Sequence, residues 1–168
     1  DIILIDGGTY NETVRANGKD ISLIGIDKTK CILKTTTGDY TAPPLEMNVG
    51  YLANMTIIAE KIEGSESPQK ITYCVHIDDM SSTGKSMLVE NCDFISDWNA
   101  CVGIGLWGNY TLTFKNCTFY KRLDEYGKTN GAVFFHNGEI NANGQKIIFD
   151  NCRIKSVGDI ALCINDVS

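Results

Sequence analysis

Short segments in which apolar and polar residues alternate recur along the whole chain. One set follows an Asn, clearly at residues 91–94, 116–119 and 151–154 and more weakly at 54–57, so that the Asn residues are 25 to 37 positions apart. A strand-like stretch precedes each strong copy, and Gly, Asn, Asp and Ser fill the gaps. Alternation in short segments rich in β-branched and aromatic residues is typical of strands.

A second set lies between the copies of the first, at residues 74–79, 101–106, 132–137 and 161–166. The first position of each copy is small, and the second and fourth are aliphatic or aromatic. No stretch of ten or more residues shows an uninterrupted helical period. The sequence therefore predicts an all-β solenoid, a parallel β-helix of about six coils, in which the second set lies in register on one sheet.

The cysteines fit this architecture better than they fit a metal site or a disulfide framework. The chain has seven Cys and two His, with no Cys-x-x-Cys pair, so we predict no metal and no cofactor. Cys92, Cys117 and Cys152 recur at one position beside an Asn that we expect to point inward at a coil corner. We therefore expect these three thiols to be buried and reduced, and the protein to fold in a reducing cytoplasm.

The composition restricts the kinds of partner that we expect the protein to bind. The net charge of −6 disfavours a nucleic acid partner, which would require a basic face. The longest apolar runs are too short to span a membrane. The chain opens and closes on strand-like residues without an initiator Met, so we expect residues 1–168 to be one β-helix domain and a piece of a longer polypeptide.

A candidate binding surface follows from alternation within the second set. The residues expected to face outward form two columns, namely His76, Gly103, Phe134 and Cys163, and beside it Asp78, Gly105, His136 and Asn165. Trp98, Trp107 and Tyr110 flank them in sequence. Flat aromatic faces beside a few carboxylates or amides are typical of sugar-binding grooves, and we predict binding through His76, Asp78, Trp98, Trp107, Tyr110 and His136. The alternative is an ordinary solvated face whose aromatic residues pack between coils.

Two further motifs point less clearly to chemistry. Gly103, Gly105 and Gly108 match a dinucleotide-binding pattern, but a strand follows them instead of the required helix, so close packing explains them better. Glycoside hydrolysis needs two carboxylates about 5–10 Å apart, for which Asp78 and Asp97 are the candidate pair.

Several segments resemble the coils of pectin methylesterases: residues 5–14, 21–25, 52–57 and 86–100. The resemblance implies the pectin-lyase-like superfamily of right-handed parallel β-helices. Its catalytic residues do not carry over. Tyr73 stands where the family has its first Gln, and Trp98-Asn99-Ala100 stands where it has Gln-Asp-Thr. Residues 131–135 lack the second Asp, so methylesterase activity is not expected.

Other members of the superfamily offer two more resemblances. Asp78-Asp79 and Arg153-Ile154-Lys155 are similar to short motifs of polygalacturonases, but the Gly-His-Gly of that family is missing between them. The alternation at 74–78 and 101–106, with its repeated Asn-Cys, resembles phage tail proteins of anaerobic Gram-positive hosts.

These observations lead to one principal hypothesis and two alternatives. The principal one is a non-catalytic segment of a phage tail fibre or spike, or of a surface protein, that binds cell-envelope polysaccharide. It places the protein in a virion tail or at the cell surface, and the tail-protein resemblance implies a homotrimer. The alternatives are a glycoside hydrolase or lyase of the same fold and a bacterial surface adhesin, so the sequence leaves catalysis open while favouring none.

Overall fold

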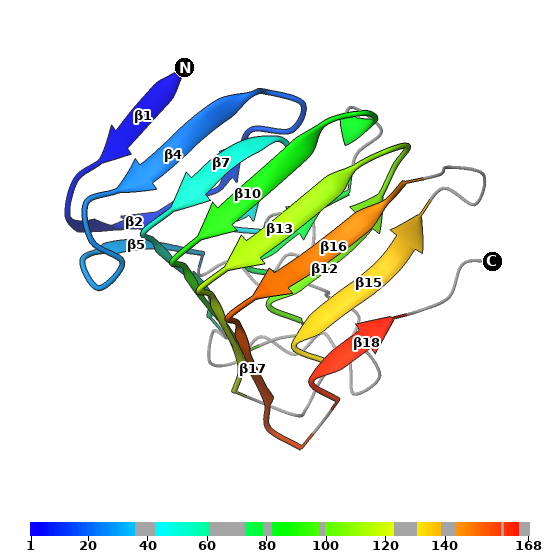
Figure 1. The fold of residues 1–168 in the computed structure, drawn as a ribbon. Coiled ribbons are helices and arrows are strands. Elements are labelled where there is room, and N and C mark those ends of the chain that lie inside the picture. Colours follow the sequence, from blue (N-terminus) through cyan, green and yellow to red (C-terminus); the bar gives the residue numbers. More distant parts are fainter. Residues whose placement is uncertain are drawn as a thin grey trace.

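The computed structural model describes residues 1–35, 43–60, 73–78, 82–97, 100–122, 131–138, 144–158 and 160–164, without the side chains of residues 136–138. Within these ranges the chain forms eighteen strands in three six-stranded sheets, and every pair of neighbouring strands is parallel. Each coil contributes one strand to each sheet, so that six coils stack along one axis (Figure 1). The predicted parallel β-helix of about six coils is confirmed.

The three sheets are named here in the order in which the first coil enters them. Sheet A contains β1 (Ile2–Ile5), β4 (Ile21–Gly25), β7 (Gly50–Ala53), β10 (Ser86–Glu90), β13 (Thr111–Lys115) and β16 (Lys146–Asp150). Sheet B contains β2 (Gly8–Asn11), β5 (Cys31–Thr35), β8 (Thr56–Ala59), β11 (Asp93–Ser96), β14 (Thr118–Lys121) and β17 (Arg153–Ser156). Sheet C contains β3 (Val14–Arg15), β6 (Leu45–Glu46), β9 (Val75–Ile77), β12 (Val102–Leu106), β15 (Val133–Gly138) and β18 (Leu162–Ile164).

Sheet C contains the second set of repeats in the predicted register, with one exception. His76 pairs with Gly103, Gly103 with Phe134, and Phe134 with Cys163. After Ile104 the register shifts by one residue, and Gly105 pairs with Asn137. The predicted alignment of Gly105 with His136 is therefore wrong, because a β-bulge in this strand pair inserts one extra residue.

The repeated Asn residues form the corner between sheets A and B. Asn54, Asn91, Asn116 and Asn151 all have a left-handed backbone, with φ between 51° and 57°. Asn adopts this conformation more readily than other residues with a Cβ. Their side chains stack along the axis, since Asn91 Nδ2 donates to Asn54 Oδ1 at 2.8 Å and Asn151 Nδ2 to Asn116 Oδ1 at 2.7 Å.

The expectation that these Asn residues point inward is wrong. Asn54 and Asn91 are half-buried, and Asn116 and Asn151 are exposed. The left-handed residue turns the chain, and the side chain that follows it then points into the core. In three coils that next residue is a cysteine, Cys92, Cys117 or Cys152.

The cysteines are free, as expected, and those of the inner coils are buried. Cys92 and Cys117 are buried, whereas Cys152 is half-buried in the last described coil. Each of the three thiols donates to the carbonyl two residues earlier, at 3.3–3.5 Å. Burial raises the pKa of the Cys117 thiol to about 12, so the thiol stays protonated at neutral pH.

Aromatic side chains fill the centre of the last coils. Phe94 and Phe119 stack at 5.2 Å, Phe114 and Phe149 stack at 5.4 Å, and Phe114 meets Phe119 edge-on at 5.1 Å. Phe94, Phe114 and Phe119 are fully buried. These contacts tie sheet A to sheet B across the interior and hold neighbouring coils at a fixed spacing.

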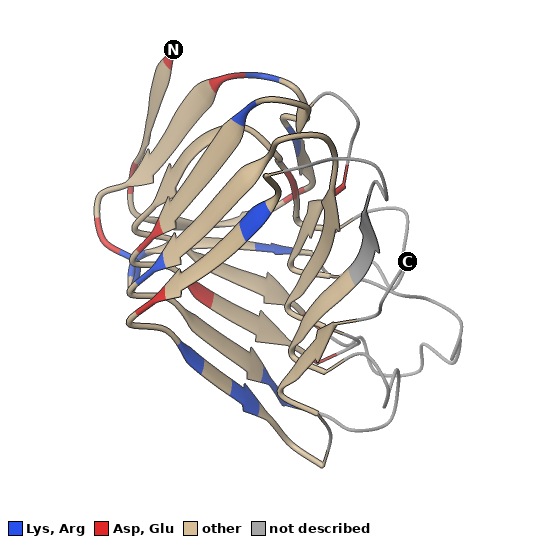
Figure 2. Ribbon diagram, turned by 45° about the vertical axis from the view of Figure 1, so that its right-hand side comes forward, with Lys and Arg blue, Asp and Glu red and all other residues tan. Residues whose placement is uncertain are grey.

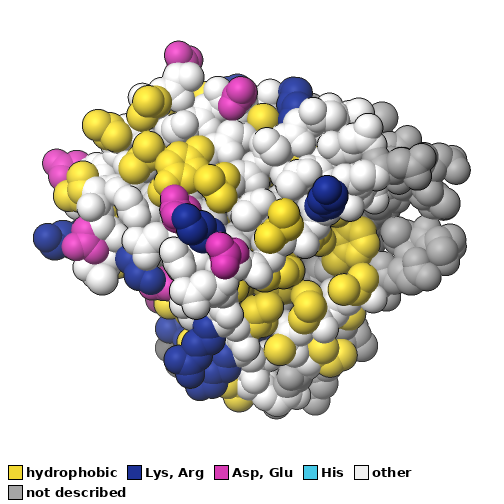
Figure 3. Space-filling view, in the orientation of Figure 1, with side chains coloured by type: hydrophobic (Ala, Val, Ile, Leu, Met, Phe, Trp, Pro, Cys, Tyr) yellow, Lys and Arg dark blue, Asp and Glu magenta, His cyan; other side chains and the backbone are white. Residues whose placement is uncertain are grey.

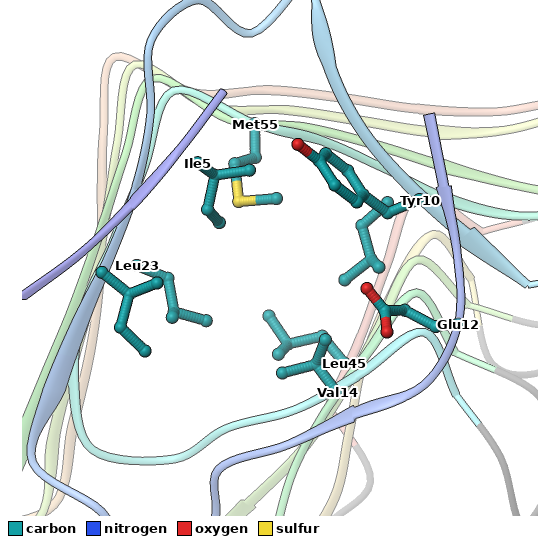
Figure 4. A pocket seen from close by; sticks show the side chains of 9 residues that line it. Ile5, Tyr10, Glu12, Val14, Leu23, Leu45 and Met55 are labelled. Atoms are coloured by element: carbon teal, nitrogen blue, oxygen red, sulfur yellow. The ribbon is translucent and has the colours of Figure 1, made fainter. Parts of the chain in front are cut away.

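The two ends of the rod expose apolar side chains of their terminal strands. Ile2 and Leu4 of β1 are exposed, as is Ile164 of β18, and Figure 3 shows hydrophobic side chains gathered where β16 and β18 lie. At the β1 end, a cavity of about 210 Å³ opens among the inward side chains of the first coils (Figure 4).

Candidate functional site

The outer face of sheet C carries a continuous column of residues from successive coils. In register these are Arg15, Glu46, His76, Gly103, Phe134 and Cys163. Arg15 Nε lies 3.3 Å from Glu46 Oε2. The strands β3 and β6 thus extend the predicted column by two charged residues. Each of these strands has only two residues, which is too short to show alternation in the sequence.

Gly103 leaves room on this face for an aromatic ring from another coil. A Cβ at position 103 would overlap the ring of Tyr73. Tyr73 in turn stacks on His76, with ring centroids 5.4 Å apart and planes 18° from parallel. Tyr73, Ala100 and Phe134 form a small buried cluster outside the main core. The Tyr73 ring therefore occupies the space beside Gly103. From the sequence we expected that space to be an open groove, and this expectation is wrong.

Gly105 leaves room for the side chain of Asp78 in the same way. A Cβ at position 105 would overlap the Asp78 carboxylate, which lies against β12. From there Asp78 Oδ1 accepts a hydrogen bond from the indole Nε1 of Trp107 at 2.6 Å. His76 Nε2 lies 3.9 Å from Asp78 Oδ2, so one carboxylate contacts both an indole and an imidazole.

The electrostatics of His76 favour the neutral imidazole. Burial lowers the pKa of His76 below its usual value of 6.5, and the nearby carboxylates of Asp78 and Glu46 oppose that shift only in part. At neutral pH the ring then presents one donor and one acceptor nitrogen. Donor and acceptor groups beside a half-buried indole are suited to hydroxyl groups of a polar ligand.

The structure brings together three of the six predicted site residues: His76, Asp78 and Trp107. Tyr110 is elsewhere, because its side chain is fully buried and its hydroxyl donates to the Asn48 carbonyl in the core. Alternation in β13 contained this information, since Leu112 and Phe114 point inward and Tyr110 shares their parity. Trp98 and the side chain of His136 lie outside the described residues.

Tyr73 and Glu46 are members of the surface that the sequence did not predict. The strip was inferred from alternation within the second set of repeats, and Tyr73 precedes that set by one residue. Its buried ring packs over the outer face of sheet C only because Gly103, in the next coil, leaves space for it. No local pattern contains such a contact between coils.

The carboxylate pair proposed for glycoside hydrolysis is not assembled. Asp97 follows β11 of sheet B and is held by Arg122, with Nε 2.6 Å from Oδ1 and Nη2 2.7 Å from Oδ2. Asp78 lies beside sheet C. Of the polygalacturonase-like motifs, Asp78 lies beside sheet C, whereas Arg153 and Lys155 lie on the outer face of sheet B. Asp79 is outside the described residues.

The cavity at the β1 end is a weaker candidate for a polar ligand. Apolar side chains surround it, including Ile5, Leu23 and Met55, and Glu12 is its one charged lining residue (Figure 4). Among the described residues no three His, Cys, Asp or Glu side chains are grouped so that they could hold a metal ion. The described part of the chain also contains no helix long and apolar enough to cross a membrane.

No family model matches the sequence, and the comparison with curated proteins finds no match. Two solved structures have the same fold. Pectin methylesterase PemA from Erwinia chrysanthemi superposes with a TM-score of 0.55 at 13% identity, and a mutant pectin methylesterase in complex with hexasaccharide IV superposes with a TM-score of 0.53 at 12% identity. Each match covers 88% of this chain and 57% of the other, so this chain spans little more than half of those proteins.

At such low identity the likeness defines the class by fold alone. The chain is a right-handed parallel β-helix with the fold of these pectin methylesterases, and this fold is the one that the sequence predicted.

Proposed function

We propose that this β-helix binds cell-envelope polysaccharide through the outer face of sheet C, around Trp107, Asp78 and His76, without catalysing a reaction. The observation that carries the proposal is the 2.6 Å hydrogen bond that fixes the Trp107 indole on the Asp78 carboxylate. A half-buried indole held in one orientation loses little conformational freedom when a ligand packs against it.

The neighbouring groups supply the rest of a sugar site. The apolar face of a sugar ring packs on an indole, while its hydroxyls need donors and acceptors nearby. Asp78 Oδ2 accepts, and neutral His76 offers one nitrogen of each kind. The side chains of His76 and Asp78 are 32% and 18% exposed, which leaves both within reach of a ligand.

The proposal of a non-catalytic role rests on the carboxylates and on the sequence. Asp97 is neutralised by Arg122, which removes the partner that Asp78 would need for glycoside hydrolysis. Trp98 and Asn99 replace the Gln and Asp of the methylesterase pattern, and an amide is neither a nucleophile nor a general base at neutral pH. That the solved relatives act on pectin therefore does not transfer to this chain.

The biological setting belongs to the same proposal. A phage tail fibre or spike, or another surface protein, presents a rigid rod to a cell-envelope glycan and requires no chemistry of it. The free, largely buried cysteines agree with folding in a reducing compartment before assembly. A homotrimer is the expected assembly for a tail protein.

The test is a comparison of Trp107→Ala with Tyr51→Ala, in which the aromatic residue lost lies on the outer face of sheet A. Cell-wall polysaccharides of anaerobic Gram-positive bacteria serve as immobilised probes. We expect Trp107→Ala to weaken binding about tenfold, which corresponds to about 1.4 kcal/mol, and Tyr51→Ala to change it less than twofold. His136→Ala examines the part of the strip predicted from sequence.

Three outcomes would refute the proposal. They are the absence of binding by the wild-type chain, equal losses in Trp107→Ala and Tyr51→Ala, and release of shorter oligosaccharides or of methanol from the probes. The last would indicate an enzyme, and its loss in Asn99→Ala would assign the activity to the methylesterase-like position.

A further inference from the structure

A second polar surface lies on sheet B, away from the surface just described. Thr118 and Tyr120 of β14 and Arg153 and Lys155 of β17 line a groove of about 210 Å³ on its outer face. Figure 2 shows Lys and Arg along β17, and Figure 3 shows a gathering of basic side chains at the lower left of the molecule.

These two cations differ from three other cations on or beside sheet B. Lys28 lies 3.0 Å from Asp93, Lys34 lies 2.9 Å from Glu60, and Arg122 lies 2.6 Å from Asp97. In the part of the chain that the structure describes, neither Arg153 nor Lys155 has a carboxylate within ion-pair distance. Two adjacent cations without a carboxylate partner among the described residues stand out in a chain whose net charge is −6.

Strand geometry directs both cations to the same ligand. Arg153 and Lys155 are separated by one residue, so they share a face of β17 and their Cα atoms are about 7 Å apart. The register places Thr118 beside Arg153 and Tyr120 beside Lys155. The Lys155 ammonium lies 4.7 Å from the centre of the Tyr120 ring. That contact holds the ammonium over the groove without cancelling its charge.

The four side chains supply the groups that an acidic sugar requires. A guanidinium binds a carboxylate or phosphate with two parallel hydrogen bonds, and an ammonium adds a second positive charge. The Thr118 hydroxyl can bond a ring oxygen or hydroxyl, and the edge of Tyr120 offers apolar contact. The volume is below that of a drug-sized pocket, so it suits one charged group on one sugar unit.

We infer that this groove on sheet B is a binding site for an anionic group, carboxylate or phosphate, carried on an acidic polysaccharide. It uses a different sheet and different residues from Trp107 and Asp78, so it stands or falls independently of the function proposed above.

The experiment measures binding of three soluble probes to the full chain by titration calorimetry. Hexagalacturonate supplies carboxylates, a glycerol phosphate hexamer supplies phosphates, and fully methyl-esterified hexagalacturonate is the uncharged control. The double variant Arg153→Gln/Lys155→Gln is compared with Lys19→Gln/Lys146→Gln, which removes two exposed cations elsewhere and changes net charge equally. Each titration is run at low and at high salt.

We expect at least one of the charged probes to bind the wild-type chain, with affinity that falls as salt rises, and the esterified probe not to bind. Arg153→Gln/Lys155→Gln should weaken binding at least tenfold, whereas the control pair should change it less than twofold. The preferred charged probe identifies the source of the anion. No binding of either charged probe, or equal losses in both double variants, would overturn the inference. Trp107→Ala should leave hexagalacturonate binding at this groove unchanged, which separates the two proposed sites.

Discussion

Asn91 turns the chain from β10 into β11 with a φ of 53°, and it is half-buried between the coils on either side. Replacing it with Ala introduces a residue whose Cβ is unfavourable in the left-handed region and which lacks the short polar side chain with which Asn can form a local hydrogen bond. This replacement costs about 1–2 kcal/mol. The same change removes the hydrogen bond from Asn91 Nδ2 to Asn54 Oδ1, worth about 1 kcal/mol. Asn91→Ala should therefore destabilise the fold by about 2–3 kcal/mol.

Asn91→Gly separates the two contributions. Glycine adopts the left-handed conformation without a steric penalty, so only the side-chain bond and about 0.5–1 kcal/mol of backbone entropy are lost. We expect a loss of about 1.5–2 kcal/mol, smaller than that of the alanine variant. For a domain of this size, 1 kcal/mol lowers Tm by about 2–4 °C, so Asn91→Ala should lower Tm by about 5–10 °C.

The assay is thermal and urea unfolding followed by circular dichroism, with Asn11→Ala as the matched control. Asn11 is exposed in β2 and is not among the residues with positive φ, so its replacement should change stability by less than about 0.5 kcal/mol. If Asn91→Ala were as stable as Asn91→Gly, or as Asn11→Ala, the corner would not depend on the left-handed Asn and the reasoning would fail.

Three other predictions concern thiols and pH. Cys117→Asp should destabilise the fold by more than about 4 kcal/mol, because it buries an unpaired carboxylate, while Cys117→Ala should be far milder; comparable urea midpoints for the two would contradict this. A thiol reagent should label half-buried Cys152 faster than Cys92 and Cys117, as mass spectrometry of native protein will show; rapid labelling of all three would mean that the column is open. Burial lowers the pKa of His76, so the unfolded chain binds more protons than the folded chain as the pH falls below 6.5. The free energy of unfolding should therefore decrease between pH 7.5 and pH 5. His76→Gln should reduce that decrease, and an equal decrease in the variant would assign it to other groups.

Part of the candidate site followed from alternation, and part did not. His76 and Asp78 were placed outward correctly because β9 is a regular strand whose neighbours Val75 and Ile77 are buried. Trp107 was expected near them from sequence proximity, but its bond to Asp78 depends on the turn that follows β12. Tyr110 was predicted on the wrong side of the chain. It lies two residues before Leu112 of β13, so the alternation of that strand, extended by one position, predicts a buried ring.

The sequence by itself determined the architecture, because a solenoid repeats the same local pattern in every coil. Like residues at equal positions stack, so Asn91 and Asn116, or Val75 and Val102, revealed both the strands and their register. Only the tertiary structure decided what depends on contacts between coils. These contacts are the packing of Tyr73 against Gly103, the one-residue shift at Gly105, and the groove that Arg153 and Lys155 line with Thr118 and Tyr120. Alternation fixes the side of a strand that a residue occupies, whereas the neighbour it meets there comes from a coil some 25 to 40 residues away and is set by packing.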